Sequence, residues 1–163
     1  MEALKKIEKK IQSLEQAIKT VQEWKNDNDK IVFTNGCFDL LHLGHLDYLS
    51  KAKDLGSKLI IGVNSSESVN RLKGPTRPIN PTESRSTMLA AFEFVDLVVI
   101  FDDDTPLNLI SNLKPNILVK GGDYSPNEVV GYEIVESYGG EVQVLDYFDN
   151  CSTTRIVKKI QEK

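Results

Sequence analysis

The 163-residue chain has few of the residues that build disulfide-rich, zinc-binding or membrane-spanning proteins. Its two cysteines, Cys37 and Cys151, are too few for a disulfide scaffold, and it has no Cys-x-x-Cys pair or His-rich tract of the kind that binds zinc. No apolar run approaches the length of a membrane span, and the charged N-terminus lacks the apolar core of a signal peptide. We therefore expect a cytoplasmic protein that does not interact with membranes.

The chain also has fewer basic than acidic residues. Lysine and arginine number 20 against 24 aspartates and glutamates, which gives a formal net charge of -4. General nucleic-acid binding needs a basic surface, so nucleic acid is not an expected partner. A local basic pocket for one small anion remains compatible with this balance. The apolar content of 40% is ordinary for a globular protein, and the length suits a single domain.

An apolar stripe at spacings of three and four residues predicts one N-terminal helix, which ends in the polar run 26–29. This divides the chain into an N-terminal helix and linker, residues 1–29, and a main domain, residues 30–163. Docking of the stripe on the domain is the favoured interpretation, but the spacing also fits pairing with a second copy, and we expect a homodimer. The stripe consists of Leu4, Ile7, Ile11, Leu14, Ile18 and Val21.

The remainder alternates short apolar runs with amphipathic segments, which predicts an α/β fold. Because each predicted strand is almost continuously apolar, the sheet should be parallel and covered on both faces, as in doubly wound Rossmann-like folds. Ligands of such folds bind outside the carboxyl ends of the strands. The five predicted strands span residues 31–34, 59–63, 95–101, 116–120 and 141–145.

The first of these strands leads through an Asn35-Gly36 turn to His42-Leu43-Gly44-His45 at the start of a predicted helix. A helix N-terminus offers unpaired N–H groups and a positive dipole, which suit a phosphate. Gly44 lets the backbone come close to a ligand, and both histidines can donate hydrogen bonds or carry charge. Donors aimed at a reacting phosphate are what nucleotidyl transfer requires. The alternative, a helix cap and a surface histidine, is disfavoured by the strand–turn–helix context.

Basic residues follow the later strands. Lys73 and Arg77 lie in a proline-rich loop, residues 73–81, where they could bind phosphate or remain solvated. Arg85 is in the first turn of a predicted helix, where a cation opposes the dipole, and this favours a phosphate-binding role. Lys120 precedes two glycines that permit a tight turn beside a nucleotide.

Two further groups have both a structural and a functional interpretation. The hydroxyl groups of Ser152, Thr153 and Thr154 either cap the last predicted helix or donate to nucleotide phosphates. Asp39 either caps a turn, orients a neighbouring donor or helps to hold Mg²⁺. The run Asp102-Asp103-Asp104 is interpreted as solvated surface charge.

These segments together resemble the cytidylyltransferase-like nucleotidyltransferase superfamily, over residues 30 to about 160. Within it, the chain is most similar to the ADP-heptose synthase type of D-glycero-D-manno-heptose 1-phosphate adenylyltransferase, in its stand-alone form or as the second domain of a bifunctional kinase/adenylyltransferase. The resemblance implies transfer of AMP from ATP to the sugar phosphate, with Mg²⁺, for lipopolysaccharide core or other surface glycans. The blocks that carry it are residues 33–45, 62–65 and 71–80, then Val119-Lys120-Gly121-Gly122-Asp123-Tyr124 and Cys151-Ser152-Thr153-Thr154.

On these grounds we assign roles residue by residue. The predicted catalytic residues are His42, His45 and Lys73, and the predicted residues for the sugar phosphate are Asp39, Asn64, Lys73 and Arg77. The predicted nucleotide-binding residues are Thr34, Asn35, Gly36, Cys37, Phe38, His42, Gly44, His45, Arg85, Lys120, Gly121, Asp123, Ser152, Thr153 and Thr154.

Two alternatives stay open. Polyol-phosphate cytidylyltransferases share the histidine motif but carry an Arg-x-Glu-Gly-Ile segment before the Ser-Thr block, and this chain has Tyr147-Phe148-Asp149-Asn150 there. Another sugar- or polyol-phosphate nucleotidyltransferase that uses CTP is therefore the second enzyme hypothesis. A non-catalytic nucleotide-binding module is the third hypothesis, and the presence of both histidines with Lys120 argues against it.

Overall fold

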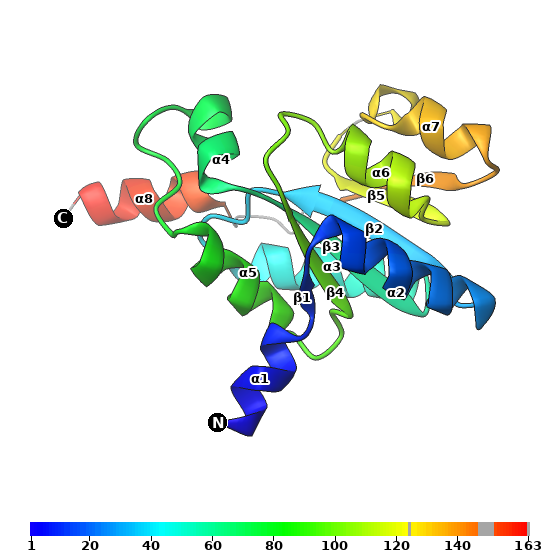
Figure 1. Cartoon of the computed structure of the whole chain (residues 1–163). Coiled ribbons are helices and arrows are strands. Elements are labelled where there is room, and N and C mark those ends of the chain that lie inside the picture. Colours follow the sequence, from blue (N-terminus) through cyan, green and yellow to red (C-terminus); the bar gives the residue numbers. More distant parts are fainter. Residues whose placement is uncertain (124, 147–151, 163) are drawn as a thin grey trace.

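A single six-stranded parallel sheet organises the computed structural model, which describes residues 1–123, 125–146 and 152–162 (Figure 1). The strand order is β1-β4-β3-β2-β5-β6, and all five neighbouring pairs are parallel. The predicted doubly wound α/β fold is confirmed, with one strand more than predicted. The strands are β1 (Ile11–Gln12), β2 (Ile31–Gly36), β3 (Lys58–Asn64), β4 (Leu97–Phe101), β5 (Ile117–Gly121) and β6 (Glu141–Leu145).

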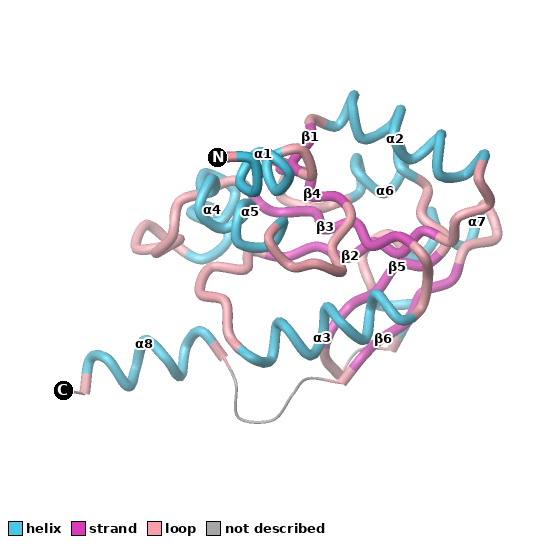
Figure 2. The backbone as a smooth tube through the Cα atoms, turned by 90° about the horizontal axis from the view of Figure 1, so that it is seen from below, coloured by secondary structure: helices cyan, strands magenta, loops and turns pink. Residues whose placement is uncertain are grey.

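Helices connect the strands and cover both faces of the sheet. Side chains of β2 alternate between the faces: Ile31 and Phe33 join a core cluster with α2, α6 and α7, whereas Val32 joins a second cluster with α3 and α5. Figure 2 shows α2 and α3 on opposite sides of the strands. The helices are α1 (Glu2–Glu8), α2 (Leu14–Asn26), α3 (Leu43–Asp54), α4 (Ser66–Lys73), α5 (Thr82–Ala90), α6 (Leu107–Leu113), η1 (Pro126–Glu128), α7 (Tyr132–Ser137) and α8 (Thr153–Gln161).

The prediction of one continuous N-terminal helix was wrong. Residues 2–8 form α1 and residues 14–26 form α2, while Ile11 between them pairs with Val98 as part of the edge strand β1. The break has a local cause, because Ser13 and Gln16 form a capping box that starts a new helix. The docking interpretation is confirmed for part of α2: of the stripe residues, Val21 is buried in the core and Leu14 packs against it, whereas Ile18 is exposed. Val21 is therefore not available for pairing with a second copy.

The topological switch point of the sheet lies between β2 and β5. The chain proceeds from β2 to β3 and then β4 on one side, whereas β5 and β6 lie on the other side of β2. In register, Phe33 of β2 faces Ile60 of β3 and Leu118 of β5. The loop that leaves β5 therefore runs away from the loops that leave β2 and β3, and this leaves room for a ligand between β2 and β5.

Candidate functional site

The two histidines lie at the beginning of α3. His42 occupies the N-cap position in an extended conformation and makes no side-chain cap, so its ring is free to turn away from the helix. The rings of His42 and His45 stack with 3.9 Å between centroids, and His45 meets Phe38 edge-on at 5.4 Å. The Nδ1 atoms of both rings are buried and have no hydrogen-bond partner among the described residues. Buried polar atoms without a partner are rare, and at a helix N-terminus they indicate an anion-binding site.

Both rings are neutral near pH 7. Burial lowers the pKa of His42. The pKa of His45 is lowered from 6.5 to about 4, mainly by burial and to a smaller extent by electrostatic repulsion from His42 and Lys73. The expectation that a protonated ring adds charge is therefore not met by His45 in this structure. Each neutral ring still carries one N–H donor.

A pH-dependent stability follows from His45. Because its pKa is about 4 in the folded chain and near 6.5 when unfolded, the unfolded state binds a proton first as the pH falls. The free energy of unfolding is therefore highest, as far as His45 is concerned, above about pH 6.5. It decreases progressively as the pH falls from about 6.5 towards 4. We expect the thermal midpoint to fall between pH 6.5 and 5, and to fall less steeply in His45→Gln. Equal slopes for both proteins in thermal melts across this interval would show that His45 does not titrate as described.

Two adjoining hollows open at the carboxyl ends of the strands. The first, about 180 Å³, contains His45 and the end of α8 at Thr153. The second, about 510 Å³, extends from Asn64 towards η1. They share five lining residues, so they form one continuous site. The shared residues are Asn35, Gly36, Cys37, Lys73 and Lys120.

Most of the predicted site residues line these hollows. The first hollow gathers, besides the shared five, Phe38, Asp39, His45, Gly121 and Thr153. Asn64 lines the second. Lys120 is half-buried, and burial lowers its pKa, an effect that the nearby Cys37 partly offsets. A desolvated ammonium group of this kind gains from a phosphate beside it.

Other predicted residues line neither hollow: some contact the protein itself and others are exposed. The hydroxyl of Thr34 is 2.6 Å from that of Tyr48, which donates to the carbonyl of Val119. Ser152 caps α8 by accepting from the N–H of Arg155, and Thr154 and Asp123 are exposed. Gly44 is buried in the first turn of α3. Tyr124 and Cys151 lie outside the described residues.

Asp39 anchors the proline-rich loop. Its carboxylate accepts from Arg77 Nη1 at 2.5 Å and from the backbone N–H groups of Ile79 and Asn80 at 2.7 and 3.0 Å. Burial alone would raise the pKa of Asp39, but the Asn80 N–H, the Arg77 side chain and the Ile79 N–H hold it below its ordinary value. Both oxygens are thus occupied, which supports the interpretation that Asp39 orients neighbouring donors. Nη1 of Arg77 is engaged by this carboxylate, and contact of Arg77 with the sugar phosphate stays a prediction.

Arg85 lies inside the protein and lines neither hollow. Its side chain is 1% exposed, and it donates to the carbonyls of Asn80, Cys37 and Asn64 and to the hydroxyl of Thr82. These acceptors, rather than a phosphate, compensate the cation in the first turn of α5, and burial lowers its pKa. Arg85 therefore ties the loop after β2 to the end of β3 and to the proline-rich loop.

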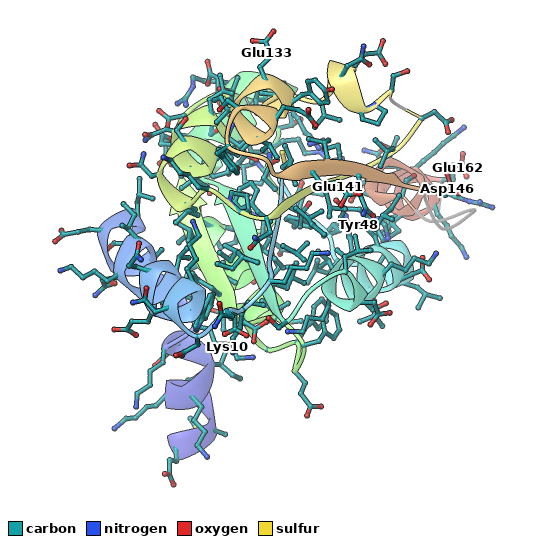
Figure 3. The ribbon with its side chains drawn as sticks, turned by 90° about the vertical axis from the view of Figure 1, so that its right-hand side faces the viewer. Lys10, Tyr48, Glu133, Glu141, Asp146 and Glu162 are labelled. Carbon is teal, nitrogen blue, oxygen red and sulfur yellow. The ribbon has the colours of Figure 1, made fainter. Side chains whose placement is uncertain are left out.

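The structure also adds lining residues that sequence reasoning missed. Tyr48 lines the first hollow, and Figure 3 shows it where α3 meets the sheet. Asp104, Thr105 and Glu128 line the second hollow. Asp104 had been interpreted as solvated surface charge. Only the fold brings the loop after β4 beside η1, so no local pattern identified these residues.

Similarity to known proteins shows to which family the chain belongs. The sequence pattern of the family described as cytidylyltransferase-like matches residues 33–159. The chain belongs to the cytidylyltransferase-like family. The match spans both hollows and runs from β2 into α8, and it confirms the prediction of a nucleotidyltransferase.

Close relatives of this cytidylyltransferase-like chain are bacterial proteins named bifunctional protein HldE. The protein of Hahella chejuensis is 56% identical over 150 residues, which are 92% of this chain and 31% of the relative. That of Campylobacter jejuni is 55% identical over 156 residues, 96% of this chain and 32% of the relative. The chain thus spans about a third of the length of these curated relatives.

Solved structures agree on the fold. A lipopolysaccharide core biosynthesis protein from Thermoplasma volcanium has a TM-score of 0.59 at 27% identity, covering 74% of this chain and 97% of that one. A pantoate-beta-alanine ligase from Francisella tularensis has a TM-score of 0.56 at 17% identity, over 94% and 78% of the two chains. In the described part of this cytidylyltransferase-like chain, no helix is both long and apolar enough to cross a bilayer.

Proposed function

We propose that the chain transfers AMP from ATP to D-glycero-D-manno-heptose 1-phosphate, giving ADP-heptose and pyrophosphate. An oxygen of the sugar phosphate attacks the α-phosphorus, and the bond between that phosphorus and the oxygen bridging to the β-phosphate breaks. Pyrophosphate leaves with the bonding electron pair. The observation that carries this proposal is the pair of buried Nδ1 atoms of His42 and His45 at the start of α3, for which the described residues offer no hydrogen-bond partner.

The histidines act as neutral donors in this reaction. Negative charge develops on the oxygens around the α-phosphorus and on the leaving pyrophosphate, and preorganised donors there lower the barrier. The low pKa of His45 makes it a hydrogen-bond donor rather than a source of charge. The stacking of the two rings at 3.9 Å keeps both near the same phosphate.

The positive charge comes from other residues. Lys73 and Lys120 line both hollows, where they can neutralise the sugar phosphate and the triphosphate together. Thr153 reaches the first hollow from the first turn of α8, where the unpaired N–H groups suit the outer phosphates of ATP. The proposal thus places the nucleotide over the start of α3, with its phosphates near α8.

Mg²⁺ enters the proposal as an ion bound to ATP. Among the described residues, no three His, Cys, Asp or Glu side chains come together to hold a metal ion, and both oxygens of Asp39 are occupied. Mg²⁺ in nucleotide enzymes is held largely by phosphate oxygens and water, which is compatible with this lining. Bound to ATP, the ion supplies charge neutralisation.

The acceptor assignment is supported by the relatives. Identity above 50% to HldE proteins extends over almost the whole chain, and the structural neighbour from Thermoplasma volcanium is described as a lipopolysaccharide core biosynthesis protein. The proposal includes a role in surface-glycan synthesis, a cytoplasmic location and a homodimer.

A pyrophosphate-release assay tests the proposal. ATP and CTP are each combined with heptose 1-phosphate and with glycerol 3-phosphate. We expect release only with ATP and heptose 1-phosphate. Release with CTP instead would favour a cytidylyltransferase, and no release with any pair would favour a binding module.

A further inference from the structure

The second hollow has two carboxylates in its lining, whereas the first has only Asp39, which is paired with Arg77. On the side away from the histidines it is lined by two carboxylates, Asp104 from the loop after β4 and Glu128 from η1, together with the hydroxyl-bearing Thr105. Carboxylates repel a triphosphate but are strong acceptors for hydroxyl groups. This end of the site is therefore suited to a neutral, hydroxyl-rich part of a substrate.

Each carboxylate is held through one oxygen. Glu128 Oε2 accepts from the backbone N–H of Ser125 at 2.9 Å, and Asp104 Oδ1 accepts from Arg71 Nε at 2.9 Å. Within residues 1–123, 125–146 and 152–162, the other oxygen of each has no hydrogen-bond partner. One anchored and one open oxygen make a preorganised acceptor, because less side-chain freedom is lost on binding.

A buried amide at the same hollow supports this assignment. Asn64, at the end of β3, is 4% exposed and lines the second hollow. Its Nδ2 donates to Ser68 Oγ at 3.0 Å, which orients the amide. Its Oδ1 accepts no hydrogen bond from the described residues, and it is not fully enclosed by them. A ligand hydroxyl in this hollow would supply the missing donor.

Lys73 and Lys120 stand at the junction of the hollows. A sugar phosphate whose phosphate lies between these cations, next to the α-phosphorus site, has its sugar carbons directed into the second hollow. Leu72 and Val130 add apolar surface at the edge of this hollow, which can pack on the carbons of a sugar ring.

We propose that the second hollow selects the acceptor by its hydroxyl groups, with Asp104 and Glu128 accepting from the polyol side of the sugar and Asn64 accepting at its floor. The proposal rests on the proposed function. Asp104 and Glu128 are then specificity-determining residues. Their substitution weakens binding of the acceptor and leaves binding of ATP unchanged.

The test compares Asp104→Ala and Glu128→Ala with wild type and with the control Glu133→Ala. Glu133 lies on α7 and points outward, away from the body of the molecule (Figure 3). We expect the KM for heptose 1-phosphate to rise about tenfold or more in the two hollow variants, because each loses a hydrogen bond to a charged acceptor. The KM for ATP should stay within about twofold of wild type, as it should for both substrates in Glu133→Ala.

A shorter acceptor provides a second readout. D-Mannose 1-phosphate of the same anomeric form lacks one hydroxyl-bearing carbon of the heptose. Wild type should prefer the heptose in kcat/KM, and at least one hollow variant should lose most of that preference. An unchanged KM for heptose 1-phosphate in both variants, with an active wild type, would overturn this inference alone. An inactive wild type would overturn the proposed function and this inference with it.

Discussion

Replacing His45 with alanine should lower kcat by about 10²- to 10³-fold, the loss typical for one donor aimed at a developing negative charge. The ring is neutral, and its Nδ1 has no hydrogen-bond partner among the residues that the structure describes. Its hydrogen bond is therefore made only with substrate, and it strengthens as charge develops in the transition state. His42→Ala should have a similar effect, because the two rings are stacked on one another.

The measurement separates catalysis from binding and folding. The KM and the binding constant for ATP should change by only a few-fold, while kcat falls. The thermal midpoint near neutral pH should fall only moderately, since the ring contacts with His42 and Phe38 are lost but no side-chain hydrogen bond within the described protein is. His45→Gln, which retains an N–H donor, should recover part of the activity. Near-normal turnover in either alanine variant would show that the histidines do not stabilise the transition state.

The second large effect concerns stability. Asp39→Ala should lower the free energy of unfolding by about 3 to 5 kcal/mol, the usual cost of removing one partner from a buried ion pair. Its carboxylate, 1% exposed, neutralises Arg77 and accepts two backbone N–H groups of the proline-rich loop. Without it, a partly buried cation and two N–H groups lose their partner.

Urea unfolding monitored by circular dichroism measures this loss. Arg77→Ala should cost less, because Asp39 keeps its two backbone donors. The double variant should be less destabilised than the sum of the two single variants, since the uncompensated cation is absent. Asp47→Ala is a matched control, because Asp47 pairs with Lys51 at the surface of α3 and such pairs contribute at most about 1 kcal/mol. A loss for Asp39→Ala no larger than that of the control would contradict the anchoring role.

Sequence periodicity was sufficient for most of the fold. The five main strands are nearly continuous apolar runs, and the helix at Leu43–Asp54 starts directly after His42 as predicted. The edge strand at Ile11–Gln12 was missed because two residues give no periodic signal and an apolar stripe continued across them. The capping box of Ser13 and Gln16 was the available clue to the break.

The site was predictable where its residues follow one another along the chain. The segment from Asn35 to His45 could be interpreted as phosphate-binding because a strand, a turn and a helix start come in sequence. The partners of Arg85 could not be inferred, since its acceptors are backbone carbonyls of Cys37 and Asn64, far away in sequence. The carboxylates of the second hollow were missed for the same reason.

The most direct test of the central claim is ³¹P NMR of the reaction of ATP, Mg²⁺ and heptose 1-phosphate with the purified chain. We expect the ATP and sugar-phosphate resonances to decrease while the resonance of pyrophosphate and the two coupled resonances of a nucleoside diphosphate sugar grow. No coupled pair should form with His42→Ala during the same time. Formation of ADP, or of AMP without a diphosphate sugar, would contradict adenylyl transfer to the sugar phosphate.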